Sequence, residues 1–206
     1  MDEDFAGFLE DFGPAIEKRH VPPSSIERYR GKLPDQLLHY WTEQGWCGYA
    51  DGLFWTVNPQ EYDPVLEAWI GDTPFMEQDA YHIIARSAFG DLYFWGEKTG
   101  NSVNLFAPGS FCIPRKSKVA TKNINFAMQL FFGMLDRERN DFEGMFGPAL
   151  KKLGRLQTDE MYGFVPAVAL GGESSIENLQ KVKAVEHLVL LAQLAPLEVI
   201  TDYSQI

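Results

Sequence analysis

The centre of the expected fold is residues 29–59, YRGKLPDQLLHYWTEQGWCGYADGLFWTVNP. In its first half, Leu37, Leu38 and Trp41 recur at the spacing of one helix face, while polar residues occupy the other face. Gly45 follows as a typical helix end. We therefore predict a short amphipathic helix that turns one apolar face toward a core.

The second half of the stretch predicts a corner and a strand. Residues 46–52 are rich in glycine, which is typical of a turn. Residues 53–57 have the β-branched and aromatic content of a buried strand, and Asn58-Pro59 stops it. None of these residues indicates chemistry, so the stretch is interpreted as a packing unit.

Working outward toward the N-terminus, residues 2–20 predict an amphipathic helix, with Gly13-Pro14 as a point where it breaks or restarts. Ser24 and Glu27 have the spacing of a capping box, which predicts another short helix.

Toward the C-terminus, Asp63-Pro64 predicts the start of a short helix that Gly71 ends. Residues 80–87, 92–95 and 103–106 then alternate with turn signals, which predicts an antiparallel meander. A short strand is expected at residues 111–113.

A basic patch at residues 115–118, with Lys122, marks the expected boundary between two regions. Beyond it we predict helices at 124–135 and 142–153, an extended segment at 156–170, and a helix over 176–194 that begins at a second capping box, Ser174 and Glu177. The fold class is therefore α+β: a helix-covered antiparallel sheet, followed by a mainly helical C-terminal region. The expected domains are 1–118 and 119–206, which are able to pack as one unit.

Charge and cysteine content limit the partners. The formal net charge of -11 repels nucleic acid and anionic membranes and favours a basic partner protein. The two cysteines, Cys47 and Cys112, are too few for a disulfide framework. The N-terminus is acidic where a signal peptide is basic, and the longest apolar run, from His187, is too short to span a bilayer. We expect a cytoplasmic protein with no direct contact to nucleic acid or membrane.

No catalytic or metal site is predicted. The histidines His20, His39, His82 and His187 are far apart, and none has a second ligand at helical spacing. No nucleophile motif accompanies His82. We expect no enzyme activity, no metal and no cofactor. The alternative is a small hydrolase or ligand-binding protein that uses a cleft between the two regions, with His82 or a carboxylate as base; a polar pocket holding a group of strongly perturbed pKa would favour it.

Acidic residues are concentrated in residues 51–100, which hold nine Asp and Glu but only Arg86 and Lys98 as bases. A basic partner is expected to dock there. From charge density and predicted loops, the candidate contact residues are Glu61, Asp63, Asp72, Glu77, Asp79 and Asp91.

Two long runs in this order, VPPSSIERYRGKLPDQLLHYWTEQGWCGYADGLFWTVNP (21–59) and AYHIIARSAFGDLYFWGEKTG (80–100), resemble the bacterial GAD-like domain. Downstream, FGPALKKLGRLQTDEMYGFVPAVALGG (146–172) and NLQKVKAVEHLVLLAQL (178–194) resemble the C-terminal domain of immunity proteins of the type VI secretion system. The succession of helix, aromatic strand and Gly-Asp hairpin is more loosely similar to the SMI1/KNR4-like immunity superfamily, which bears on fold only.

The resemblance implies an antitoxin-like immunity protein. Such a protein stays in the cytoplasm of the producing cell and binds a cognate secreted toxin, which is a DNase in the best-known members. A nuclease needs a basic surface for phosphates, so an acidic inhibitor suits it. A structural adaptor in secretion is a third reading.

Overall fold

The protein is described from a computed structural model that places residues 2–115, 118–120 and 122–201. Lys116 and Ser117, from the predicted basic boundary, lie outside these residues. The strands are β1 (Ile16–Arg19), β2 (Trp46–Tyr49), β3 (Phe54–Thr56), β4 (Tyr81–Ser87), β5 (Asp91–Gly96), β6 (Gly100–Phe106), β7 (Phe111–Pro114), β8 (Glu160–Phe164), β9 (Leu179–Lys183) and β10 (Glu198–Val199). The α-helices are α1 (Glu3–Phe12), α2 (Pro23–Tyr29), α3 (Asp35–Gln44), α4 (Asp63–Ile70), α5 (Phe75–Gln78), α6 (Ile124–Gly133), α7 (Arg137–Asn140), α8 (Phe146–Leu153) and α9 (Ala184–Leu194). The 3-10 helices are η1 (Ala50–Gly52), η2 (Pro59–Tyr62), η3 (Ala107–Gly109), η4 (Val168–Leu170) and η5 (Ile176–Asn178).

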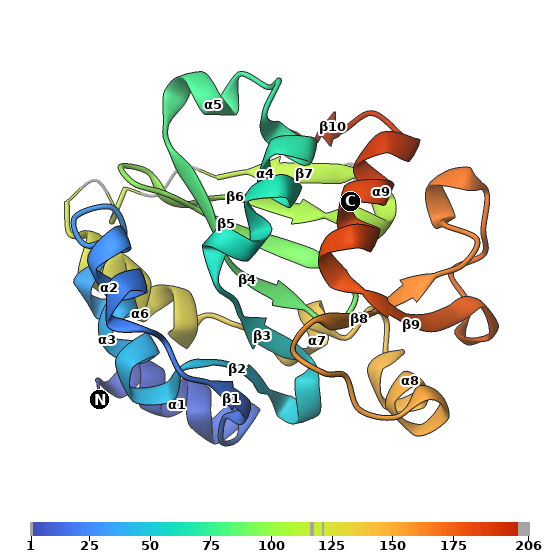
Figure 1. Cartoon of the computed structure of the whole chain (residues 1–206), viewed down its shortest axis with the longest axis horizontal. Coiled ribbons are helices and arrows are strands. Elements are labelled where there is room, and N and C mark those ends of the chain that lie inside the picture. The colour runs from blue at the N-terminus through green and yellow to red at the C-terminus, as the bar shows by residue number, and fades with distance from the viewer. Residues whose placement is uncertain (1, 116–117, 121, 202–206) are drawn as a thin grey trace.

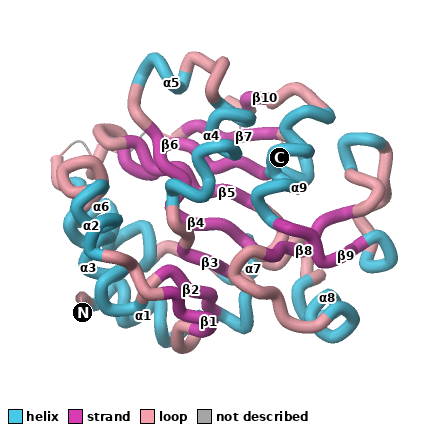
Figure 2. Tube along the Cα trace, in the orientation of Figure 1, coloured by secondary structure: helices cyan, strands magenta, loops and turns pink. Residues whose placement is uncertain are grey.

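A large sheet with strand order β1-β2-β3-β4-β5-β6-β7-β10 runs through the molecule (Figures 1 and 2). Strands β1 to β7 pair antiparallel with their chain neighbours, whereas β10 pairs parallel with β7. Strands β8 and β9 form a separate antiparallel pair. The predicted antiparallel meander is confirmed.

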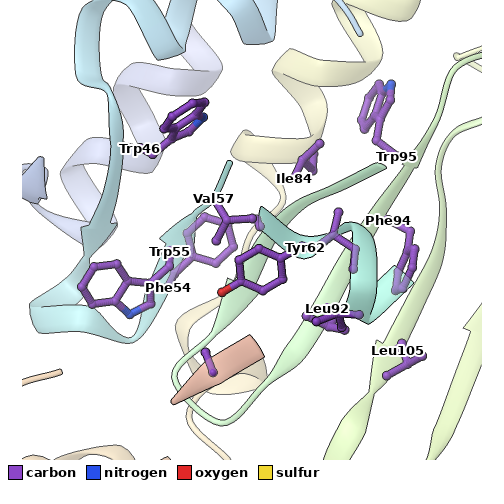
Figure 3. Close-up of a cluster of buried hydrophobic side chains, with 14 of the residues drawn as sticks. Trp46, Phe54, Trp55, Val57, Tyr62, Ile84, Leu92, Phe94, Trp95 and Leu105 are labelled. Carbon is purple, nitrogen blue, oxygen red and sulfur yellow. The ribbon is translucent and has the colours of Figure 1, made fainter. Parts of the chain in front are cut away.

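Helices α4 and α9 cover one face of the sheet, and both cross in front of it in Figure 1. The indole Nε1 of Trp69 in α4 donates a hydrogen bond to the backbone oxygen of Leu188 in α9 at 3.0 Å. Leu92 and Phe94 of β5 lie on this face and are fully buried, and Figure 3 shows them near Tyr62. Side chains alternate along a strand, so the residues between them face the other way.

Helix α6 covers the opposite face. The rings of Tyr93 and Trp95 from β5 contact Phe131 of α6, with centroids 5.6 and 6.2 Å apart. Helix α1 packs beside α6 on the same face, where Phe8 contacts Tyr49 of β2 and Phe54 of β3. Helix α3 packs against both helices, and Tyr40 stacks on Phe5 at 4.0 Å. The sheet is therefore covered by helices on both faces, which confirms the predicted α+β class.

The stretch 29–59 forms the predicted helix as α3, whose Leu37, Leu38 and Trp41 are buried. Strand β3 lies inside the predicted strand. The predicted corner is wrong in part, because residues 46–49 form strand β2 and pair antiparallel with β3. Gly48 permits this close pairing, since a Cβ there would meet the Trp55 ring at 3.0 Å. Only residues 50–52 turn, as η1.

The predicted helix over residues 2–20 is too long. Helix α1 ends at Phe12, Gly13 has a φ of 75°, and residues 16–19 form edge strand β1 instead. The capping box at Ser24 and Glu27 does not form either: α2 begins after Pro22 with no side-chain cap, and Glu27 pairs with Arg30 at 2.7 Å.

The predicted helix over residues 176–194 is also only half right. Its first part is η5 and strand β9, and helix α9 begins at Ala184. Leu179 and Val182 have helical spacing, but they pair with Phe164 and Met161 of β8. The second capping box, Ser174 and Glu177, therefore caps no α-helix.

The two predicted regions share one hydrophobic core. Figure 3 shows part of this core. Phe54 turns to the α6 face, where its ring centroid lies 6.5 Å from that of Phe132, whereas Trp55 and Tyr62 lie on the face that α4 covers. Arg86 of β4 is fully buried there, and its guanidinium lies 5.2 Å from the Trp55 ring centroid. The same side chain donates to the backbone oxygens of Thr158 and Glu160, at 3.2 and 2.7 Å. Arg86 thus ties the C-terminal region to the sheet.

Candidate functional site

Four of the six candidate contact residues are exposed: Glu61, Asp63, Asp72 and Glu77. They follow one another along η2, α4 and α5, with Asp72 in the turn between the two helices. Glu67 of α4 is exposed among them. Asp63, Glu67, Asp72 and Glu77 are called the acidic surface below.

Glu61 differs from the other exposed carboxylates because it already has a cationic partner. Its two oxygens accept hydrogen bonds from the Arg19 guanidinium at 2.9 and 2.8 Å. Both side chains are exposed by 37% or more, so the pair adds little to stability. It does reduce the local negative charge, and Glu61 is left out of the acidic surface for that reason.

Asp79 is buried, which contradicts the expectation of an exposed contact. Its carboxylate accepts hydrogen bonds from the backbone N–H groups of Ala80, Lys98 and Thr99 and from the Thr99 hydroxyl, at 2.8 to 3.0 Å. A short polar side chain commonly orders a turn in this way. Asp79 therefore holds the turn between β5 and β6.

Asp91 is buried as well, and the expectation that it is a surface contact is wrong for the same reason. Its carboxylate accepts a hydrogen bond from the Ser87 hydroxyl at 3.0 Å. Burial raises the pKa of Asp91 to about 7, although the Ser87 hydrogen bond acts in the opposite direction. Desolvation disfavours the ionised carboxylate, so about half of this group is protonated at pH 7.

A cavity of about 300 Å³ opens beside Asp91, between strands β5 and β6 and helices α6 and α7. It lies between the two regions predicted from the sequence, and it contains a carboxyl group of raised pKa. Both features belong to the alternative prediction of a hydrolase or ligand-binding protein. Sequence reasoning found Asp91 but placed it on the surface, because its neighbours in the cavity come from distant segments.

The predicted base of that alternative, His82, does not line the cavity. Its Nε2 lies 2.9 Å from the Glu97 carboxylate, and its ring packs edge-on against Tyr29. Ser87, which touches Asp91, is fully buried and is not a lining residue. Across residues 2–115, 118–120 and 122–201, no group of three or more His, Cys, Asp or Glu side chains is placed to hold a metal ion.

The described part of the chain contains no helix that is long and apolar enough to cross a membrane. Cys47 and Cys112 are both free and buried. Burial raises the pKa of both thiols, that of Cys112 to about 11, so neither is an activated nucleophile.

Fold and surface together define an acidic α+β protein with an antiparallel sheet between two helical layers. Residues 3–108 match the GAD-like domain, and this chain belongs to that family. Residues 125–195 match the C-terminal domain of the T6SS immunity protein Tdi1. Both resemblances identified in the sequence are confirmed.

A similar solved structure is the crystal structure of Atu4351 from Agrobacterium tumefaciens. It superimposes with a TM-score of 0.86 over 98% of this chain and 95% of that chain, at 23% sequence identity. This likeness shows the fold, including the association of both regions. No curated protein matches the chain.

Proposed function

We propose that this protein is an immunity protein that binds and neutralises a cognate toxin of the type VI secretion system. The observation that carries the proposal is the match of residues 125–195 to the C-terminal domain of a T6SS immunity protein, joined in one chain to a GAD-like domain. The action we propose is stoichiometric binding in the cytoplasm of the producing cell, without catalysis.

We further propose that the toxin is a nuclease, and that the acidic surface covers its active site or substrate groove. Asp63, Glu67, Asp72 and Glu77 are exposed carboxylates on neighbouring turns and helices. A nuclease needs a positive surface to hold phosphates, and carboxylates placed against such a surface steer association and exclude the substrate. The net charge of -11 supports the same partner.

The first experiment co-expresses the protein with the toxin-like product of the neighbouring gene. We expect growth to be rescued and the two purified proteins to form a stoichiometric complex. Loss of DNA cleavage in the presence of the protein would support the nuclease assignment. Failure both to bind and to rescue growth contradicts the immunity function, and binding to secretion components without rescue would favour an adaptor instead.

The second experiment tests the acidic surface by reversing the charge of α4 with Asp63→Lys and Glu67→Lys. A matched control is Glu3→Lys with Glu10→Lys, which reverses exposed carboxylates at the start and in the body of α1. We expect the α4 variant to slow association about tenfold or more at low salt, because electrostatic steering acts on the association rate. The control should bind as the wild type does. Equal effects of the two variants would move the interface away from α4.

A further inference from the structure

The cavity beside Asp91 combines a polar floor, two arginines and an apolar wall, and toxin binding by the acidic surface does not require this arrangement. Its floor comes from the face of β5 and β6 that α6 covers, and its walls come from α6, α7 and the segment after β7. Its central lining residues are Asp91, Tyr93, Asn104, Arg115, Met134 and Arg139. The acidic surface lies on α4 and α5, and α4 packs on the opposite face of the sheet, so the two sites are separate.

The floor is polar where a helix-covered sheet face is normally apolar. Asp91 and Asn104 of the floor are each exposed by 9%, and Asn140 of the adjoining α7 wall is exposed by 1%. The Tyr93 hydroxyl donates to the Asn140 side-chain oxygen at 2.9 Å, and Asn101 donates to the Asn104 oxygen at 2.8 Å. Within the described ranges, neither the Asn104 amide nitrogen nor the second Asp91 carboxyl oxygen has a hydrogen-bond partner. Neither atom is fully enclosed by protein, so both can offer a hydrogen bond to a ligand in the cavity.

Two arginines stand at the cavity. The Arg115 guanidinium makes no hydrogen bond or ion pair with any residue that the structure places. Arg139 has a weak ion pair, because its Nε lies as far as 3.8 Å from the Asp136 carboxylate oxygen. Burial and the Asp91 charge raise the pKa of Tyr93, whereas the Asn140 hydrogen bond and the charges of Arg115 and Arg139 lower it, as expected for two cations close to the cavity floor. The Asp136 carboxylate is occupied as the N-cap of α7, where it accepts from the Glu138 N–H at 2.9 Å. Positive charge therefore remains available to an anion.

The α6 wall is apolar. Leu130, Phe131 and Met134 of this wall line the cavity together with Val119 and Leu135. Met134 is 74% exposed, an unusual position for a large apolar side chain next to a cavity. An apolar group bound there would remove this surface from water.

We propose that this cavity binds a small organic anion that joins an apolar body to a carboxylate, sulfonate or phosphate group. The anionic group lies against Arg115 and Arg139, the apolar body lies on the α6 wall, and a polar substituent reaches Asn104 and Asp91. A volume of about 300 Å³ is at the lower end of the range of small-molecule sites. This inference does not depend on the toxin-binding role.

The test uses two fluorescent probes and the full chain. The anionic probe is 8-anilinonaphthalene-1-sulfonate, and its uncharged counterpart is N-phenyl-1-naphthylamine. We expect the sulfonate to bind at one site per chain and to be displaced by octanoate but not by inorganic phosphate. Absence of saturable binding at a single site would overturn the proposal.

Charge variants then locate the site. Met134→Glu places a negative charge at an exposed position, where it does not disturb the core, and Met134→Gln is its uncharged control. We expect Met134→Glu to weaken sulfonate binding about tenfold relative to Met134→Gln, with little change for the neutral probe. The double variant Arg115→Gln with Arg139→Gln should weaken sulfonate binding by a similar factor. Its control is Arg28→Gln with Arg155→Gln, which changes two exposed arginines that do not line the cavity and should leave sulfonate binding unchanged. Sulfonate binding that is insensitive to both cavity variants would overturn the proposal.

Toxin protection serves as an independent readout. Met134→Glu should leave rescue of growth unchanged, because the acidic surface is intact. If rescue fails in the wild type while the probe binds as expected, only the immunity function is contradicted.

Discussion

Arg86 is a fully buried arginine without a carboxylate partner among the residues that the structure places. A buried cation is normally paired with a carboxylate, yet the hydrogen bonds of Arg86 go to the Tyr62 hydroxyl and to the backbone oxygens of Ser87, Thr158 and Glu160. The planar guanidinium can reach several oxygens at once, which lysine cannot. One side chain therefore satisfies backbone groups from both sequence regions.

Replacing Arg86 with methionine should lower the free energy of unfolding by about 3 kcal/mol or more, because the backbone oxygens of Thr158 and Glu160 and the Tyr62 hydroxyl lose their donor. The measurement is urea unfolding. The control is Arg155→Met, which removes an exposed ion pair with Asp51 and should cost at most about 1 kcal/mol. A mutant of wild-type stability at position 86 would show that the buried network is not required.

The raised pKa of Asp91 predicts that the stability of the folded protein depends on pH. Burial raises the pKa of Asp91 from its ordinary value of 3.8 to about 7 in the folded protein, so between these pH values the folded state holds a proton that the unfolded state has released. Stability from this group is full below about pH 4 and is lost as the pH rises through 7. The loss amounts to at most about 4 kcal/mol for a shift of this size. Urea unfolding at pH 5 and pH 8 measures the larger part of this loss, with Asp91→Asn as the variant that cannot titrate.

The comparison to make is the difference between the two proteins at each pH, because all other groups titrate in both. Wild type should lose stability relative to Asp91→Asn on going from pH 5 to pH 8. A constant difference would mean that Asp91 is ionised in the folded protein throughout.

At the scale of elements, Gly45 ends helix α3 and also allows strand β1 to pass close to that helix end. Gly45 has a φ of 82°, and a Cβ at this position would meet the backbone oxygen of Arg19 in β1. Gly31 has a similar φ of 74°, but it has open space around it. Substitution of Gly31 therefore measures the cost of backbone strain alone, and substitution of Gly45 measures strain together with crowding against β1.

Gly31→Ala should cost about 1 kcal/mol of stability, from the positive φ alone. Gly45→Ala should cost about 3 kcal/mol, because β1 must also shift away from α3. Thermal or urea unfolding of the two variants gives the difference directly. Equal losses in the two variants would show that β1 can shift away from α3 with no further loss of stability.

Strand β9 shows the limit of periodicity as a guide to an element. Ile176, Leu179, Val182 and Val185 repeat at helical spacing, but the first part of this run pairs with β8. A run this short satisfies more than one pattern, and the partner strand decides between them. The predicted helix is correct only from Ala184 onward.

At the scale of the whole molecule, the helices after residue 118 complete the core of the sheet before it. Phe131 and Phe132 of α6 contact Tyr93, Trp95 and Phe5. A fragment of residues 1–118 would expose this face to water. We therefore expect that residues 1–118 and 119–206 do not fold independently, although the two family matches fall on either side of the predicted boundary.

We expect the 1–118 fragment to lack a cooperative unfolding transition and to show a poorly dispersed NMR spectrum, because it loses the apolar cover of one sheet face. The full chain provides the reference under the same conditions. A fragment that unfolds cooperatively would establish the first region as an autonomous domain.

The sequence by itself determined the fold class, the central helix and strand of residues 29–59, the meander of β4 to β6, and the family. These features depend on local spacing, turn residues and long runs of core residues, which are all visible along the chain. Only the tertiary structure decided that Asp79 and Asp91 are buried, that Glu61 is paired with Arg19, and that a cavity lies between β5, β6 and α6. Burial and ion pairing depend on which distant residues come together in the fold. The identity of an aspartate or glutamate in the sequence does not show whether its carboxylate is buried or exposed.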